Sequence, residues 1–283
     1  MLSVLKVGGS VLRDEPSYAA TAEFLKDRLS LHADERLVVI VSAQYGATDE
    51  LLAEAEAITP EPEAHALDLL WCTGELRSVA RLTLHLQRIG ISAIPFNVHQ
   101  TGLVASPEQD RGADRVAGTT VRPLRLLAAL AASRIVIVPG FLGVSAGGAI
   151  TSLGRGGSDL TAVLLAIAVR ADACELVKDV AGYFTADPHR DAAARPIHDL
   201  SIDDAIRMAD AGCDLVQRGA LAAAAQANLH LVVRSMNAAA PVTHVYPSIE
   251  RRAIERDDTS RQDRSKQHGV RHQDDSRRTA VGA

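Results

Sequence analysis

Short apolar runs alternate along this chain with longer segments of helical pattern. Runs rich in Val, Ile and Leu predict buried strands at residues 2–7, 36–43, 91–97, 134–140, 174–180 and 230–235. The segments between them predict helices at about residues 18–31, 63–88, 121–133, 159–170 and 201–212. Strands that alternate with helices predict an α/β fold, a three-layer αβα sandwich with a mainly parallel central sheet.

The pattern changes at Ser248. Residues 248–283 consist mostly of Arg, Asp, Ser, Gln and His and contain no Phe, Trp or Tyr. Such a segment cannot bury enough apolar surface to offset the entropy lost on ordering. We therefore expect one folded domain at residues 1–247 and a polar, disordered tail at residues 248–283.

Composition and charge narrow the class of protein. The formal net charge of the 283 residues is −5, which argues against a nucleic-acid partner. No apolar run approaches the roughly 20 residues that span a bilayer, and the first residues lack a signal-peptide pattern. Three widely spaced cysteines match no zinc-site spacing and are typical of reduced thiols. We expect a cytoplasmic protein with no membrane partner.

Clusters of glycine, serine or charged residues lie at the carboxyl ends of four of the predicted strands. They are Lys6-Val7-Gly8-Gly9-Ser10, residues 41–43, residues 140–143 and residues 178–182. In open parallel sheets, ligands bind outside the carboxyl ends of the strands. Glycines let the backbone approach a ligand, their amides can cradle phosphate oxygens, and a lysine adds positive charge. The clusters predict a phosphate-binding edge, although the chain has no P-loop motif.

The stretch TSLGRGGSDLTA at residues 151–162 precedes an apolar helix. We expect Ser158 and Asp159 to cap that helix. Arg155 carries a fork that fits a carboxylate, whereas Asp159 is suited to orient a lysine, an amine or a metal-bound water. The two charges together fit a zwitterion such as an amino acid. A capped helix with an exposed arginine is the alternative.

Several motifs occur in order along the chain. They are KVGGS at 6–10, VVIVSAQYGATDEL at 38–51, TGELRSVA at 73–80, IVPGFLG at 137–143, TSLGRGGSDLTA at 151–162, CELVKDVAGYFTADP at 174–188 and RMADAG at 207–212. Over about residues 2–240 the chain resembles the catalytic domain of aspartokinases, in the amino acid kinase family. The resemblance implies phosphoryl transfer from MgATP to the side-chain carboxylate of aspartate, with ATP and Mg²⁺ as cofactors and a homodimeric assembly.

The resemblance also assigns roles to residues. Lys6 and Asp159 are the expected catalytic residues: Lys6 neutralises the transferring phosphoryl group, and Asp159 organises the site and its lysine contacts. The expected substrate-binding residues are Ser42, Glu75, Arg155 and Ser158, with Glu75 and Arg155 holding the ammonium and carboxylate of the amino acid. The expected nucleotide-binding residues are Gly8, Gly9, Ser10, Lys178, Asp179, Tyr183 and Asp187. No metal ligand is assigned.

The chain also departs from the aspartokinase pattern. Asp214 stands where a basic residue is expected near the nucleotide phosphates, and Gln217-Arg218 replaces a His-Pro pair. Arg218 or Lys178 could compensate for that charge. Bulky Tyr45 replaces a small residue near the substrate. Because the chain ends in a polar tail, we expect no ACT regulatory domain and no feedback control through one.

Two alternatives remain open. One is a member of the same family that phosphorylates a different carboxylate, a carbamate or a phosphate. The other is a non-catalytic subunit that binds a nucleotide or an amino acid.

Overall fold

The computed structural model describes residues 1–105, 118–154, 156–188 and 190–247. Its main sheet has eight strands in the order β10-β12-β11-β9-β1-β2-β6-β3. They are β1 (Leu2–Val7), β2 (Arg36–Val41), β3 (Ile94–Pro95), β6 (Ile135–Pro139), β9 (Ala173–Val177), β10 (Asp199–Ser201), β11 (Leu231–Arg234) and β12 (Thr243–Tyr246). The six strands from β11 to β3 in this order are parallel to one another. Strand β12 is antiparallel to β11, and β10 is parallel to β12. The predicted mainly parallel sheet is confirmed.

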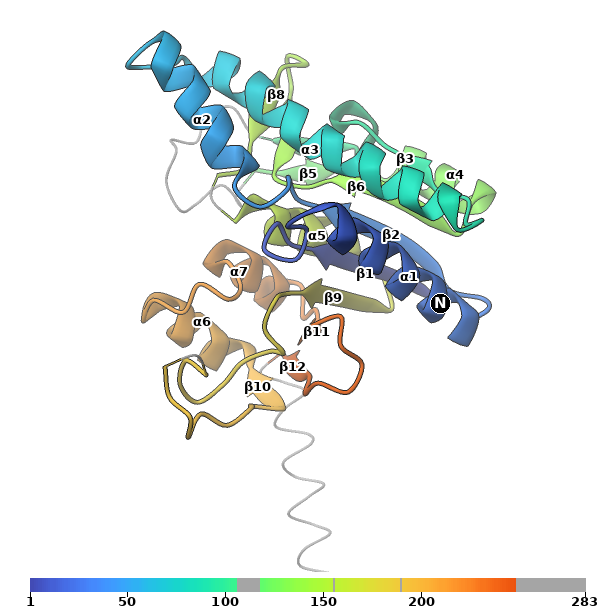
Figure 1. Ribbon diagram of the computed structural model, residues 1–283, viewed down its shortest axis with the longest axis vertical. Helices are drawn as coiled ribbons and strands as arrows, with labels where there is room; N and C mark the ends of the chain where they lie inside the picture. The colour runs from blue at the N-terminus through green and yellow to red at the C-terminus, as the bar shows by residue number, and fades with distance from the viewer. Residues whose placement is uncertain (106–117, 155, 189, 248–283) are drawn as a thin grey trace, which may run out of the picture.

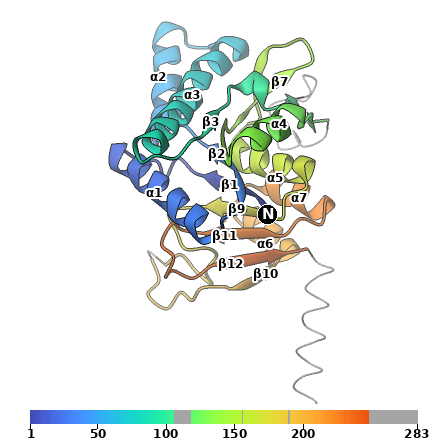
Figure 2. The ribbon, with the colours of Figure 1, turned by 90° about the vertical axis from the view of Figure 1, so that its right-hand side faces the viewer.

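Helices cover both faces of this sheet (Figure 2). One face packs against α1 (Glu15–Leu31) and α3 (Ala64–Arg88), and the other against α4 (Leu124–Ala132), α5 (Gly157–Val169), α6 (Ile202–Asp210) and α7 (Arg218–Gln226). Side chains of a strand alternate between the two faces: Leu5 and Val39 pack with α1 and α3, and Val4 and Val38 pack with α5. This alternation of buried residues explains why the strands read as continuous apolar runs, and it confirms the three-layer αβα sandwich.

A second, smaller sheet adjoins β6. It has the order β5-β4-β7-β8, with β4 (Leu103–Ala105), β5 (Thr120–Val121), β7 (Leu142–Ser145) and β8 (Ile150–Ser152), and η1 (Val98–Gln100) precedes β4. Figure 1 shows β8 beside α3, which itself packs against α2 (Ala47–Ile58), and away from α6 and α7. Because β7 begins three residues after β6 ends, this sheet stands at the carboxyl edge of the main sheet.

Several sequence predictions of elements need correction. The strand predicted at 91–97 is only β3, and the strand predicted at 174–180 ends at Val177, before Lys178. The predicted final strand is followed by β12, which closes the folded part. Helix α2, helix α7 and the whole second sheet were not predicted. No helix among the described residues combines the length and apolar character needed to cross a bilayer.

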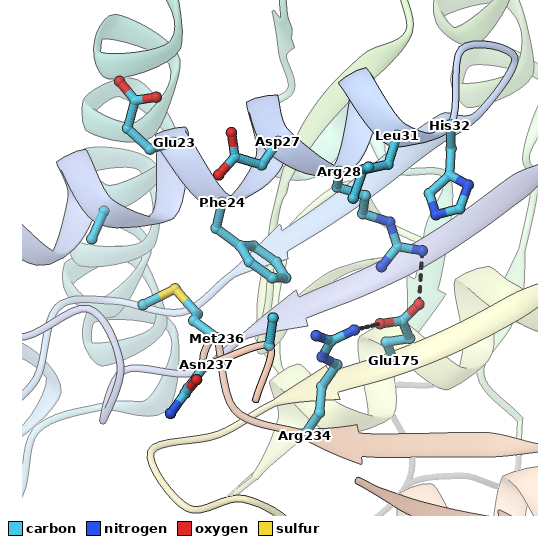
Figure 3. A pocket seen from close by; sticks show the side chains of 12 residues that line it. Glu23, Phe24, Asp27, Arg28, Leu31, His32, Glu175, Arg234, Met236 and Asn237 are labelled. Atoms are coloured by element: carbon cyan, nitrogen blue, oxygen red, sulfur yellow. Dashed lines mark ion pairs between the residues drawn. The ribbon is translucent and has the colours of Figure 1, made fainter. Parts of the chain in front are cut away.

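A buried chain of ion pairs joins α1 to the sheet. Arg28 Nη2 lies 2.7 Å from Glu35 Oε1 and 2.7 Å from Glu175 Oε1. Arg234 Nη1 lies 3.6 Å from Glu175 Oε2, so Glu175 stands between two guanidinium groups (Figure 3). Ser3 donates a hydrogen bond of 2.5 Å to Glu35 from β1. These contacts fix the last turns of α1 over β1, β9 and β11.

Candidate active site

Two lysines share one buried aspartate at the carboxyl edge of the main sheet. Lys6, on β1, places its Nζ 2.9 Å from Asp159 Oδ1. Lys178 directly follows β9, and its Nζ lies 2.8 Å from Asp159 Oδ2. All three residues are buried, and the backbone N–H of Gln217 donates a further hydrogen bond of 3.2 Å to Asp159 Oδ2. The structure thus brings together three of the predicted site residues from two adjacent strands and a helix.

The electrostatics of this cluster leave one lysine charge uncompensated. Burial raises the pKa of Asp159, but the charges and hydrogen bonds of Lys6 and Lys178 outweigh it and hold that pKa well below its usual range. Burial lowers the pKa of Lys178 to about 8, with Lys6 acting in the same direction and Asp159 opposing it. An ionised Asp159 between two cationic lysines leaves net positive charge, which suits an incoming phosphate.

The start of α5 differs from the capping prediction. The N-cap is Gly156, not Ser158 or Asp159, and it has a φ of 73°. A Cβ at this glycine would lie 2.4 Å from Cγ of Gln217, so this turn requires glycine. Ser158 and Asp159 lie inside the first turn, and both are buried. The carboxylate of Asp159 is therefore turned to the lysines instead of the helix end.

Glu75 lies buried on α3, with 3% of its surface exposed. Burial raises the pKa of its carboxyl group to about 8, although hydrogen bonds from the backbone at Ala43 and Gly140 and the charge of Lys6 lower it. Its Oε2 is buried and accepts no hydrogen bond from the described residues. A buried acceptor without a donor costs free energy unless a ligand supplies one. Glu75 therefore fits an ammonium group.

The loops around Glu75 come from neighbouring strands. Gly140, which follows β6, has its amide 2.9 Å from the carbonyl of Val41. A Cβ at Gly140 would lie 2.5 Å from Oγ of Ser158, so this loop contacts the first turn of α5 only because residue 140 is glycine. Ser42 is half-buried and follows β2, with its amide 3.2 Å from the carbonyl of Val7. Ser42 thus lies in a loop at this edge of the sheet and Ser158 in the first turn of α5, and their substrate-binding roles stay predictions.

The glycine turn after β1 contacts the loop after β9. Oγ of Ser10 donates a hydrogen bond of 3.1 Å to Asp179, and the amide of Gly8 lies 3.3 Å from the carbonyl of Val177. A Cβ at Gly9 would lie 2.8 Å from the carbonyl of Ala43, in the loop after β2. The predicted phosphate-binding turn is therefore enclosed by the loops of both neighbouring strands.

Two other predicted nucleotide residues lie further along the chain. Tyr183 is 1% exposed, and its hydroxyl has no hydrogen-bond partner among the described residues; burial raises its pKa. Asp187 is half-exposed and forms an ion pair of 3.6 Å with Arg190. Both residues follow Lys178 in the loop between β9 and β10, and their roles stay predictions.

The remaining predictions concern charge. Arg155 lies outside the described residues. Asp214 is exposed in the turn between α6 and α7, three residues before Gln217. Arg218, considered as a substitute cation, is exposed and pairs with Asp210 at 2.6 Å.

A cavity of about 640 Å³ lies beneath α1, lined by other residues than the lysine–aspartate cluster (Figure 3). Phe24, Arg28, Glu175, Arg234 and Met236 contribute to its lining, which contains none of the predicted site residues. Its two arginines are engaged with Glu35 and Glu175. The backbone links it to the lysine cluster, since the amide of Lys178 donates a 2.8 Å hydrogen bond to the carbonyl of Arg234.

The sequence did not single out every residue of the site. Gln217 contacts Asp159 through its backbone N–H. The only sequence feature that drew attention to this residue is that Gln217 stands where the aspartokinase pattern has a histidine. Arg13 and Gln44 join the loops at the mouth of the site. Arg13 belongs to none of the quoted motifs, Gln44 was given no role within the motif at 38–51, and single polar residues in loops give no periodic signal.

The sequence profile of the Amino acid kinase family matches residues 1–235. An aspartokinase of Thermus thermophilus is 37% identical over 236 residues, which make up 83% of this chain and 56% of that protein. Aspartokinase 2 of Bacillus subtilis is 38% identical over 200 residues, or 71% of this chain and 48% of that protein. This chain spans about half the length of these curated relatives.

A solved structure agrees with the sequence matches. The crystal structure of aspartate kinase from Synechocystis matches with a TM-score of 0.76 and 33% identity, covering 87% of this chain and 40% of that chain. The family profile covers residues 1–235, which is most of the chain. The chain belongs to the amino acid kinase family.

Proposed function

We propose that this protein transfers the γ-phosphoryl group of MgATP to the side-chain carboxylate of aspartate. The observation that carries the proposal is the buried cluster of Lys6, Asp159 and Lys178, at the same sheet edge as Glu75, whose buried Oε2 lacks a donor. The cluster suits a phosphate and Glu75 suits an ammonium group, so the pair fits an amino acid that receives a phosphoryl group.

In the proposed reaction, Glu75 holds the substrate ammonium. Arg155 is the predicted partner of the α-carboxylate. A side-chain carboxylate oxygen attacks the γ-phosphorus, a new O–P bond forms, and the bond to the bridging oxygen of ADP breaks. No general base is required, because a carboxylate is already ionised at neutral pH. The role of the protein is to position both substrates and to stabilise charge.

Lys6 and Lys178 supply that stabilisation. Both ammonium groups are fixed by Asp159, so they need not reorganise as negative charge shifts toward the leaving phosphate. Mg²⁺ enters with the nucleotide; the described residues contain no group of three or more His, Cys, Asp or Glu side chains suited to a metal ion. The aspartokinases of Thermus and Bacillus, which share over a third of their aligned residues with this chain, support aspartate as the acceptor.

The test is ADP release from MgATP in the presence of a panel of acceptors. The panel contains aspartate, glutamate, N-acetylglutamate, carbamate and UMP. We expect aspartate to stimulate ADP release well above every other compound. Stimulation by another acceptor alone would assign a different reaction of the same family, and the absence of stimulation by any acceptor would contradict a catalytic role.

A further inference from the structure

We propose that Arg13 binds the phosphates of the nucleotide and that Tyr45 holds the Arg13 side chain in position, so that Arg13 supplies the positive charge that Asp214 does not. This inference rests on the proposed function, because it assumes that the glycine turn after β1 receives a nucleotide. It assigns a role to Tyr45, the bulky residue that departs from the aspartokinase pattern.

The contacts of Arg13 place its guanidinium beside the glycine turn. Nε donates a hydrogen bond of 2.7 Å to the carbonyl of Ser10, the last residue of the turn. Nη2 lies 3.3 Å from Asp179 Oδ2, while Ser10 itself donates to Asp179 Oδ1. One arginine therefore joins the loops that follow β1 and β9, which are the loops expected to surround the nucleotide.

The loop after β2 holds Arg13 in place. The guanidinium carbon of Arg13 lies 5.1 Å from the centre of the Tyr45 ring, within the range of a cation–π contact. Gln44 donates a hydrogen bond of 2.9 Å to the carbonyl of Arg13, and the amide of Tyr45 lies 3.0 Å from the carbonyl of Leu12. Arg81 in turn donates to the side chain of Gln44. Tyr45, which is 62% exposed, thus rests on Arg13 instead of packing in the core.

Arg13 is able to exchange its partner. Its side chain is 56% exposed and that of Asp179 is 43% exposed, and exposed ion pairs are weak. A guanidinium forms stronger, two-pronged hydrogen bonds with phosphate oxygens. Since Nε stays bound to Ser10, the two terminal nitrogens remain over the glycine turn when a nucleotide displaces Asp179.

The other cations considered for this site have positions or roles of their own. Lys6 and Lys178 share Asp159 and face the transferring phosphoryl group in the proposed reaction, whereas Arg218 pairs with Asp210 and Arg190 pairs with Asp187. Within the described part of the chain, Arg13 is the arginine that hydrogen-bonds to the glycine turn. It is therefore the best-placed substitute for the basic residue expected at position 214.

The test is calorimetric titration of MgATP into the full chain without an acceptor. Arg13→Gln should lower MgATP affinity by about tenfold, the scale for losing a charged hydrogen bond. The matched control is Arg36→Gln, which removes the same charge from an exposed residue at the opposite, amino-terminal end of β2 and should leave affinity unchanged. Equal affinities of the two variants would overturn the inference.

Two further measurements separate binding from loop structure. The loss in Arg13→Gln should shrink as ionic strength rises, because it is electrostatic; a loss that salt does not alter would show that Arg13 only shapes the turn. Arg13→Lys keeps the charge but loses the two-pronged geometry, so it should recover part of the affinity; no recovery would overturn the inference. If the wild-type protein binds MgATP and Arg13→Gln binds it equally well, only the inference about Arg13 fails. If the wild-type protein itself binds no MgATP, the proposed function fails as well.

The role of Tyr45 is tested by a double-mutant cycle. Tyr45→Phe keeps the ring and should bind MgATP as the wild type does, whereas Tyr45→Ala should weaken binding several-fold. In the Arg13→Gln background, Tyr45→Ala should have no further effect. Equal losses in both backgrounds would show that Tyr45 acts independently of Arg13 and would overturn its positioning role.

Discussion

Lys6 is the residue on which the proposed chemistry depends most. Its ammonium group is buried and fixed by Asp159, and the residue lies two positions before Gly8, the first glycine of the turn. We expect Lys6→Ala to lower turnover by about 10²-fold or more, the scale for losing one preorganised electrostatic contact. Steady-state ADP release measures the effect, and circular dichroism verifies the fold. A folded variant that turns over within a few-fold of the wild type would remove Lys6 from the catalytic set.

The raised pKa of Glu75 leads us to predict that substrate binding depends on pH. Its pKa is raised to about 8 by burial, so the free protein holds this group largely protonated at neutral pH. An ammonium group needs the ionised form, and binding must therefore release a proton. Aspartate affinity should rise by about tenfold or more from about pH 6 to about pH 8, since the ionised fraction rises over that range.

Calorimetry in buffers of different ionisation enthalpy measures both the affinity and the released proton. The control variant is Glu75→Gln, which should bind aspartate more weakly and with no pH dependence over the same range. A wild-type affinity that is flat in pH would mean that Glu75 does not receive the ammonium group.

Asp214 gives a charge-reversal prediction. The residue is exposed in the turn three residues before Gln217, whose amide contacts Asp159. We expect Asp214→Lys to tighten MgATP binding a few-fold, with the gain shrinking as salt rises. Asp34→Lys makes the same change in an exposed loop at the other end of the sheet and should have no effect. If both variants bind MgATP as the wild type does, this turn lies outside the nucleotide site.

At the residue level, the sequence was most informative where a charged side chain lies in a cluster at a strand end or at the start of a helix. Lys6 and Lys178 lie at the ends of β1 and β9 and Asp159 lies in the first turn of α5, and the structure brings the three together. The capping role of Ser158 and Asp159 was wrong, because the lysines compete for the carboxylate and only the tertiary structure places them. Arg13 could not be predicted, since its contacts come from loops that follow three different strands.

At the scale of elements, the last turns of α1 depend on Arg28. Arg28→Ala leaves Glu35, which is 1% exposed, and Glu175 without their shared partner. Removing one member of a buried ion pair costs about 3–5 kcal/mol, and we expect a loss of this size in the free energy of unfolding. Urea denaturation at neutral pH measures it.

Lys26→Ala is the matched control on the same helix. Lys26 pairs with Glu23 at 2.9 Å on the surface, and because exposed ion pairs are weak, its loss should leave the free energy of unfolding nearly unchanged. If Arg28→Ala is no more destabilising than Lys26→Ala, the ion-pair chain does not hold α1 on the sheet.

The helices and strands differed in how well they could be predicted from the sequence. Short, mostly apolar runs predicted β1, β2 and β6 to within two residues at each end. The second sheet was missed because its strands have two to four residues, too few to show a period. Helix α7 was missed although RGALAAAAQ is rich in alanine, which is a helix signal that was available.

At the scale of the whole molecule, the parallel sheet explains the position of the site. The adjacent strands β9, β1, β2 and β6 all end at one edge, so four separated sequence clusters meet there. The sequence sufficed to predict this convergence because it follows from topology alone. The reversed direction of β10 and β12 relative to the rest of the sheet was not predicted, since the direction of a strand depends on the path of the loops that connect it.

The central claim is that the phosphoryl group reaches a carboxylate of aspartate. The most direct test incubates the protein with MgATP, aspartate and hydroxylamine, which traps an acyl phosphate as a hydroxamate. We expect aspartyl hydroxamate with its new bond at the side-chain carbonyl, formed in proportion to ADP and nearly abolished in Lys6→Ala. ADP release without any hydroxamate, or a hydroxamate at the α-carboxyl group, would contradict the account.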